Sequence, residues 1–244
     1  MHLVLFILSC PVVVTSVEVT RANKQGYPIG PKMWWEFVKN KSMPEIGNNI
    51  SLDGYVYYDE SHYNISHSNT WEYFNELLKK AQEYLHNHSI MVNIQTIEVK
   101  EVKNLTFHFP NKTLGGRQTL QNLTQYGHSL NKSNNSVFFL YVWPGGTDMN
   151  KTALVLDYNK SQPIHVSEVS TENTFCTNNT SAAVIRHRHK SNNYWSTVKA
   201  IVDIFGSRHF IAFDKTDWET MNKTFSHCPL HTTAKATPTE LPAC

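Results

Sequence analysis

The residues best suited to chemistry in this sequence lie between Val198 and Phe210. Lys199 and Asp203 stand four positions apart, which places them on one face of a helix and allows an ion pair between them. His209 follows shortly afterwards, and a carboxylate and an imidazole are both ordinary metal ligands. A charged lysine has only donors and no lone pair, so it cannot bind a metal ion. The segment therefore offers an ion pair, either solvated on an exposed face or held at a site, and Asp203 and His209 are the first ligands to test for a metal.

A helix has to position these side chains, and the sequence predicts one that ends at Gly206. Its apolar residues recur at helical spacing: Tyr194, Val198, Ile201, Val202 and Phe205. Ser191 or Asn192 can cap the first turn by accepting a backbone hydrogen bond. Gly206 has no Cβ and can enter the left-handed conformation, so we expect the chain to turn there and to bring His209 back across the helix end.

This layout resembles the zinc helix of the metzincin metalloproteases, H-E-x-x-H-x-x-G-x-x-H. Gly206 falls on the glycine of that motif and His209 on its third histidine. Lys199, Ala200 and Asp203 stand where the first histidine, the glutamate base and the second histidine would be. Catalytic zinc needs three neutral or anionic ligands, an open position for water and a base. The resemblance therefore implies a pseudoenzyme of the zinc metallopeptidase class, with degenerate zinc-site positions, no catalytic residue, no metal and no cofactor.

The first residues predict a secretory signal peptide over positions 1–16. Its apolar run, Leu3–Val14, is too short to span a bilayer. The small residue Ser16 suits cleavage before Val17. We therefore expect a secreted, extracellular product.

The remainder of the chain predicts one main domain over residues 17–230 and a flexible tail, rich in Thr, Pro and Ala, over residues 231–244. The net charge is +2, from 22 basic and 20 acidic residues. Such a balance gives no reason to expect nucleic acid or a membrane as a partner.

The cysteines predict one disulfide and one remaining thiol. Cys10 leaves with the signal peptide, and Cys176, Cys228 and Cys244 remain, an odd number for an oxidising compartment. The reprolysin branch of the metzincins carries a cysteine upstream of the zinc helix that is bonded to the C-terminal part of the domain. This resemblance implies that Cys176 pairs with Cys228 or Cys244, with Cys228 preferred. Cys244 then offers a thiol for a disulfide-linked dimer.

Asn-x-Ser/Thr sequons are dense along the chain, and each marks a position that is exposed if it is glycosylated. They begin at Asn40, Asn49, Asn64, Asn87, Asn104, Asn111, Asn122, Asn131, Asn134, Asn150, Asn159, Asn178, Asn179 and Asn222. We therefore expect a heavily N-glycosylated surface.

The hydrophobic pattern predicts alternating strands and helices. The strands are expected at Gly54–Tyr58, Ile90–Val99 with a bulge, Val137–Trp143 buried on both faces, Ala153–Tyr158 nearer an edge, and Ala182–Ile185. Helices are expected at Trp71–Leu85, with a capping box from Asn69 to Glu72, and at Gln118–Leu130.

This order of elements indicates an α/β (α+β) fold. It is also similar to the order in the metzincin N-terminal subdomain, which implies a three-layer sandwich with a mixed, twisted five-stranded sheet and long helices. By the same resemblance, Met221 lies near the place of the methionine turn that underlies the zinc in that family.

The chain is similar to the degenerate, reprolysin-like metalloproteases of tick salivary secretions. That similarity implies a protein that acts by binding an extracellular host protein or ligand and so modulates haemostasis or immunity. One alternative is an active zinc metallopeptidase with atypical ligands. Another is a lipocalin-like binder of small ligands, against which the two long helices argue, since a lipocalin is an eight-stranded barrel.

Overall fold

The computed structural model describes residues 44–59, 69–110, 113–143, 155–157 and 164–229. The expected signal peptide and C-terminal tail lie outside these ranges. The elements run in the order β1 (Ser51–Tyr58), α2 (Thr70–Asn87), β2 (Asn93–Glu101), β3 (Leu114–Gly115), α3 (Gly116–Ser129), β4 (Ser136–Val142), β5 (Val155–Asp157), β6 (Ile164–Val166), β7 (Glu168–Ser170), β8 (Ser181–Arg186), α4 (Trp195–Phe205) and α5 (Lys215–Phe225). None of these helices is long and apolar enough to cross a membrane.

A five-stranded sheet in the order β2-β1-β4-β8-β7 forms the centre of this part of the chain. The strands β2, β1, β4 and β8 run parallel, and β7 pairs antiparallel with β8 at one edge. Every residue of β4 is buried, because helices cover both faces of a parallel sheet, and this explains its uninterrupted apolar sequence. The pairing of β1 with β2 shifts register between Gly54 and Tyr55 of β1. Such a shift marks a β-bulge, so the bulge predicted for the strand that is observed as β2 is confirmed.

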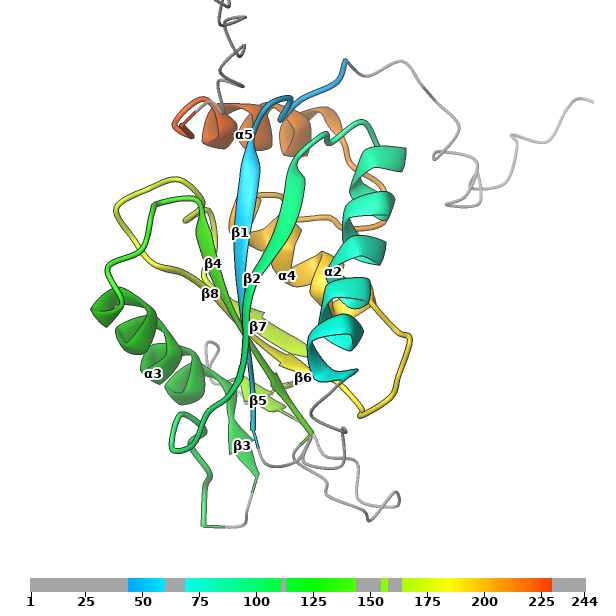
Figure 1. The fold of residues 1–244 in the computed structure, drawn as a ribbon. Helices are drawn as coiled ribbons and strands as arrows, with labels where there is room; N and C mark the ends of the chain where they lie inside the picture. The colour runs from blue at the N-terminus through cyan, green and yellow to red at the C-terminus, as the bar shows by residue number, and fades with distance from the viewer. Residues whose placement is uncertain (1–43, 60–68, 111–112, 144–154, 158–163, 230–244) are drawn as a thin grey trace, which may run out of the picture. The chain divides into compact units, whose positions relative to one another are not determined.

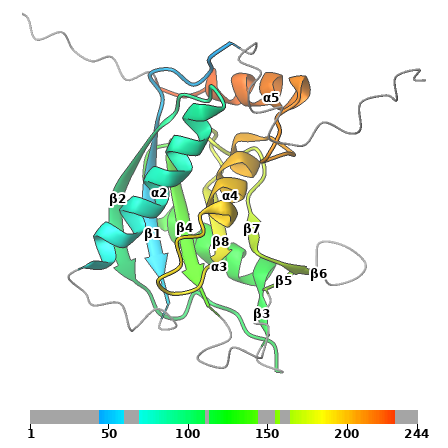
Figure 2. The same cartoon turned by 90° about the vertical axis from the view of Figure 1, so that its right-hand side faces the viewer.

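Helices cover both faces of the sheet, with α3 on one side and α2 and α4 on the other (Figure 1 and Figure 2). One apolar cluster joins the sheet to α2, α4 and α5 and contains Phe74, Phe139 and Ile201. A second cluster lies on the side of α3 and contains Leu123 and Phe138. The expected α/β sandwich around a mixed five-stranded sheet is confirmed.

Gly127 lies inside α3, where a glycine normally weakens a helix. A Cβ at this position would lie 2.6 Å from Cδ2 of Phe138 in β4. We predict that Gly127→Ala lowers the free energy of unfolding by about 1–3 kcal/mol, because overpacking outweighs the gain of about 1 kcal/mol in helix propensity. Urea denaturation measures the change, with Gln125→Ala on the exposed side of α3 as the control. A more stable Gly127→Ala variant would contradict this close packing.

Two parts of the sheet arrangement differ from expectation. The strand expected at Ala153–Tyr158 appears as β5, which belongs to a separate three-stranded sheet with β3 and β6. The fifth strand of the main sheet is instead β7, which spans only Glu168–Ser170. A strand of three residues is too short to show an alternating pattern, so hydrophobic periodicity does not predict it.

The helix α5 was also not predicted. It buries Trp218, Met221 and Phe225 at helical spacing. Met221 is fully buried in the core that α5 shares with the sheet and α4. The expected methionine turn at Met221 is therefore wrong, because this residue is a core position of a helix.

The capping box expected at the start of α2 does not form. Asn69 directly precedes the helix, but its side chain makes no capping hydrogen bond. Glu72 is exposed in the first turn, where its negative charge still suits the positive end of the helix dipole. The helix itself is confirmed and runs two residues beyond its expected end.

A disulfide joins Cys176 to Cys228, which lies just after α5. Both cysteines are buried in the core cluster on the side of α2 and α4. The bond is the pairing that the reprolysin resemblance implied, and it ties α5 to the loop between β7 and β8. Cys244 lies outside the described residues.

Most sequons within the described residues lie on the surface. The exposed ones begin at Asn49, Asn87, Asn104, Asn131, Asn134, Asn178, Asn179 and Asn222. Asn122 is half-buried and its amide donates a hydrogen bond to the Leu105 carbonyl at 3.0 Å. The sequons at Asn40, Asn64, Asn111, Asn150 and Asn159 lie outside the described residues. The geometry leaves the exposed group open to glycosylation and makes Asn122 the least accessible acceptor among the described sequons.

Candidate functional site

The helix α4 carries the candidate site and packs against the sheet through a wide apolar face. Its buried residues are Thr197, Val198, Ala200, Ile201, Val202, Ile204 and Phe205. The helix begins after Tyr194, which provides no side-chain cap. Asn193 Oδ1 accepts a hydrogen bond from the Trp195 backbone N–H at 3.0 Å. The cap expected at Ser191 or Asn192 is therefore wrong.

Lys199, Asp203 and Glu168 form a charged cluster between α4 and β7, which we call the Lys199 cluster. The Lys199 ammonium donates to the Glu168 carboxylate and lies 3.6 Å from Asp203 Oδ2. Ser170 Oγ donates to the same Asp203 oxygen at 3.2 Å. The side chains of Lys199, Asp203 and Glu168 are 36%, 22% and 2% exposed. The expected ion pair between Lys199 and Asp203 is therefore present, and a buried glutamate holds it at the edge of the sheet.

The Lys199 cluster contains two carboxylates and one cation, and the pKa of Asp203 is shifted first by burial and then by these charges. Burial raises that pKa to about 6, the positive charge of Lys199 opposes the rise, and the negative charge of Glu168 adds to it. Burial lowers the pKa of Lys199, but its hydrogen bond to Glu168 and the charges of both carboxylates outweigh burial and raise the pKa. Lys199 is therefore held in its charged form, and Asp203 gains a proton in mild acid.

Gly206 ends α4 in the left-handed conformation, with φ of 96°, as predicted. Its N–H donates to the Asp203 carbonyl at 3.0 Å, and the Ser207 N–H donates to the Val202 carbonyl at 2.9 Å. A Cβ at Gly206 would also lie 2.7 Å from Asn173 Oδ1. The turn after α4 therefore requires glycine both for its backbone conformation and for the close approach of a neighbouring loop.

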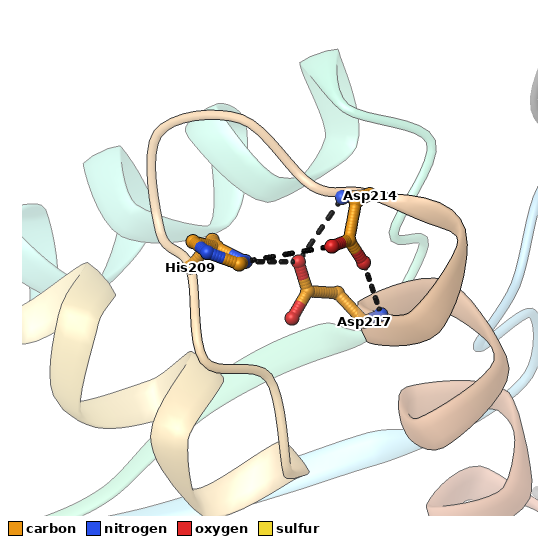
Figure 3. Close-up of side chains that lie close together, drawn as sticks. All are labelled: His209, Asp214 and Asp217. Atoms are coloured by element: carbon orange, nitrogen blue, oxygen red, sulfur yellow. Dashed lines mark hydrogen bonds and ion pairs between the residues drawn. The ribbon is translucent and has the colours of Figure 1, made fainter.

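His209 follows this turn and contacts the start of α5 (Figure 3). His209 Nδ1 lies 2.7 Å from Asp217 Oδ2 and 4.0 Å from Asp214 Oδ2. The two aspartates form a capping box, in which Asp214 Oδ1 accepts from the Asp217 N–H at 2.8 Å and Asp217 Oδ2 accepts from the Asp214 N–H at 3.0 Å. The Arg208 N–H donates to Asp217 Oδ1 at 2.9 Å. The residue at the third-histidine position thus belongs to a helix cap.

We predict that His209 titrates at a higher pH than an ordinary histidine. The hydrogen bond from His209 to Asp217 and the negative charge of Asp217 raise the pKa of His209. Because the folded pKa exceeds the unfolded value near 6.5, the stability that His209 contributes is present below about pH 6.5 and is lost as the pH rises through the folded pKa.

Proton NMR of the histidine rings tests this prediction. The midpoint assigned to His209 should fall toward the ordinary value in Asp217→Asn, while histidines that do not contact position 217 keep their midpoints. An unchanged midpoint for His209 in a folded variant would show that Asp217 does not control it.

The side chains at the degenerate positions do not fit a catalytic zinc ion. Lys199 offers an ammonium group without a lone pair, and that group is already bound by carboxylates. Ala200 is fully buried and has no group that could act as a base. Asp203 accepts hydrogen bonds within the Lys199 cluster, whereas His209 is turned toward Asp217. At these described positions, the ligand set and the base that zinc hydrolysis requires are therefore not assembled.

Among the described residues, one group of three ligand atoms lies close enough together to consider for a metal ion. It consists of His209, Asp214 and Asp217, whose candidate atoms lie within 4.8 Å of one another. Asp203 is not part of this group: of the two ligands first considered, Asp203 contacts Lys199 and Ser170, whereas His209 contacts Asp217. Both aspartates already accept backbone N–H bonds at a helix N-terminus, where the helix dipole favours anions and disfavours a cation. The arrangement is that of a helix cap.

Glu168 and Asp217 are the two residues of this region that the sequence analysis missed. Glu168 comes from a strand too short to recognise, and its partner on α4 is 31 positions away. Asp217 follows Asp214 by three positions, the spacing of a capping box, so this local signal could have revealed the start of α5.

No protein-family model matches the chain, and no curated protein matches it. Among solved structures, metalloproteinase-II from Bacteroides fragilis is similar, with a TM-score of 0.45 and 10% sequence identity over 78% of this chain and 60% of that chain. The alignment thus spans less than two thirds of that protein. The chain is a mixed α/β protein whose function has to be argued from its own residues.

Proposed function

We propose that this chain is a secreted, glycosylated, catalytically inactive metalloprotease-like protein that acts by binding a host extracellular protein or ligand. In this proposal, binding modulates haemostasis or immunity. The observation that carries the proposal is the Lys199 cluster, in which the ammonium of Lys199 occupies the position of a metal ligand and is neutralised by Glu168 and Asp203.

Hydrolysis of a peptide bond needs an activated water and a group that takes its proton. At the position of the base, Ala200 presents a buried methyl group. The carboxylate of Asp203 is half-buried and paired with Lys199, so it is not placed as a free base. In this chain, the residues at the positions that a metzincin uses for chemistry hold α4 against β7 and contact the cap of α5.

Three features support an extracellular location. The apolar run Leu3–Val14 has the length and flanks of a signal peptide. The Cys176–Cys228 disulfide is typical of an oxidising compartment. Sequons are frequent on the described surface. Treatment of the secreted protein with an N-glycosidase should lower its apparent mass if these sequons are used.

The alternatives differ in how they fit the fold. A lipocalin-like binder does not fit, because the described residues form an α/β sandwich around a largely parallel sheet, and a lipocalin is an antiparallel barrel. An active zinc peptidase with atypical ligands would require Lys199 to leave its two carboxylates and His209 to leave Asp217. These contacts of Lys199 and His209 therefore favour binding over catalysis.

A peptide-cleavage assay tests the proposal. The purified secreted protein is incubated with a quenched fluorescent peptide library, with added zinc or with a chelator, beside the matched variants His209→Ala and His227→Ala. We expect no cleavage above the buffer rate under any of these conditions. Cleavage that needs zinc, stops with the chelator and is lost in His209→Ala but not in His227→Ala would overturn the proposal.

A binding experiment tests the proposed interaction with a host extracellular protein or ligand. The glycosylated protein is immobilised and exposed to host plasma, and retained components are eluted with the same protein in solution. A component that is retained and then displaced in this way is the expected result. Retention of nothing across plasma and leukocyte secretions would contradict a role in haemostasis or immunity.

A further inference from the structure

A cavity of about 590 Å³ lies between α2 and the chain segment that leads from β8 to α4. This segment runs beside α2 before it enters α4 (Figure 2). The helix lines one wall with Asn69, Glu72, Tyr73, Glu76, Leu77 and Lys80, and the segment lines the other with residues 189–192. The volume lies within the range of small-molecule sites, roughly 300–1,000 Å³. The cavity is separate from the Lys199 cluster and shares no residue with it.

Tyr73, which lines the cavity, connects its two walls. Tyr73 Oη lies 2.5 Å from His187 Nε2 and donates to the Ser191 carbonyl at 3.0 Å. His187 is buried at the end of β8, and its ring packs against those of Tyr73 and Tyr141. Leu77 is buried one turn along the helix from Tyr73. The hydrogen bonds of the partly buried Tyr73 and the packing of its ring against His187 therefore hold the two walls together.

Charges of opposite sign are separated along the helical wall. Glu72, Glu76 and Lys80 follow one another at intervals of four residues and so lie on one stripe of α2. Glu76 and Lys80 have a spacing that favours an ion pair, yet Lys80 Nζ lies 3.5 Å from Asn192 Oδ1 on the opposite wall. Within the described part of the chain, no ion pair involves Glu72, Glu76 or Lys190. The two carboxylates and the two ammonium groups of the cavity are thus available to a ligand.

We propose that this cavity binds a small zwitterion, with the ammonium group of the ligand between Glu72 and Glu76 and its acidic group at Lys80. The midpoint of the two glutamates lies six residues from Lys80, which corresponds to about 9 Å along the helix. Lys190 on the opposite wall adds a second positive charge for the acidic end. Tyr73 and Leu77 provide an apolar surface for the middle of the ligand.

The described residues that line the cavity offer no site for N-glycosylation. Neither Asn69 nor Asn192, the two asparagines among them, begins an Asn-x-Ser/Thr sequon. The site thus deepens the proposed binding function, on which it rests, by naming the class of one ligand.

The tripeptide Gly-Tyr-Gly is a suitable probe, because its free termini are separated by roughly 7–10 Å when it is extended. Binding to the full-length secreted protein is measured by ligand-observed NMR and by calorimetry at low salt, where surface charges are least screened. The N-acetylated and the C-amidated forms of the probe each remove one terminal charge.

We expect the unmodified protein to bind the free tripeptide and the double variant Glu72→Gln/Glu76→Gln to bind it at least tenfold more weakly. Glu83→Gln, an exposed glutamate on the same helix outside the cavity, should leave the affinity unchanged. N-acetylation of the probe should weaken binding to the unmodified protein by a similar factor and should weaken binding to the double variant no further. C-amidation of the probe should likewise weaken binding to the unmodified protein and should weaken binding to Lys80→Gln no further.

Absence of binding by the unmodified protein at millimolar tripeptide would overturn the proposal. Equally strong binding by the double variant Glu72→Gln/Glu76→Gln and by the control Glu83→Gln would also overturn it, since the carboxylates of the cavity would then play no part. Circular dichroism and urea denaturation confirm that each variant is folded. Cleavage of the tripeptide in the presence of zinc would contradict the inactive state and leave the cavity assignment standing, so the two failures are distinguishable.

Discussion

Replacement of Lys199 by alanine should lower the free energy of unfolding by about 2–3 kcal/mol at pH 8, measured by urea denaturation. The substitution leaves Glu168 almost fully buried without its cation and leaves Asp203 with only Ser170 as a partner. Removal of one member of a buried ion pair costs about 3–5 kcal/mol, and the partial exposure of Lys199 reduces this figure.

The loss should shrink as the pH falls. The pKa of Asp203 in the folded protein is about 6, above its ordinary value of 3.8, so between these values the folded state holds a proton that the unfolded chain has released. Stability from this group therefore falls as the pH rises through that window. Lys199 lowers the pKa of Asp203, so its removal raises that pKa and enlarges the dependence of stability on pH. The Lys199→Ala variant should therefore recover part of its lost stability at pH 5.

Lys215→Ala is the matched control, because Lys215 pairs with Glu219 at 3.6 Å in an exposed i,i+4 pair. Such a pair contributes about 0.5 kcal/mol or less, and its loss should depend little on pH between 5 and 8. Equal effects of the two substitutions would show that the Lys199 cluster is a solvated surface pair.

Loss of the Cys176–Cys228 disulfide should have the largest effect on stability. The two cysteines are separated by 52 positions, and the loop-entropy relation gives about 4 kcal/mol for a closed loop of this length. Cys228→Ser should therefore unfold at a much lower urea concentration than the unmodified protein, and α5 with its cap at His209 and Asp217 should lose protection first. Hydrogen exchange measures the local effect.

Cys244→Ser provides the comparison for this variant. It should leave the urea midpoint unchanged and should abolish any disulfide-linked dimer seen on a non-reducing gel. A large loss of stability in Cys244→Ser, with none in Cys228→Ser, would assign the structural disulfide to Cys244.

The elements that the sequence predicted well are those with long and regular patterns. The stripe of apolar residues in α2 and the continuous apolar run in β4 each determine one type of element, because no other placement buries them. The elements that were missed are β7, too short for a pattern, and α5, which has only three large apolar residues, separated by Glu, Thr, Asn and Lys.

The candidate site was predictable only where its contacts are local. The ion pair between Lys199 and Asp203 follows from helical spacing, and the turn at Gly206 follows from the missing Cβ. Glu168 and Asp217 reach Lys199 and His209 through the tertiary packing of β7 and α5; the capping-box spacing of Asp214 and Asp217 indicates where α5 begins but not that it contacts His209. These two acidic residues decide that Lys199 is neutralised and that His209 is part of a helix cap.

The proposed function requires that the residues at the zinc-site positions hold no catalytic metal, and this requirement can be checked by measuring the zinc content of the secreted protein. The protein is produced by cells in zinc-supplemented medium, desalted and analysed by mass spectrometry for metal per chain, with Asp217→Asn as a second sample. We expect zinc far below one per chain in both samples. One zinc per chain that a chelator removes, and that is lost in His209→Ala, would show that these positions form a metal site.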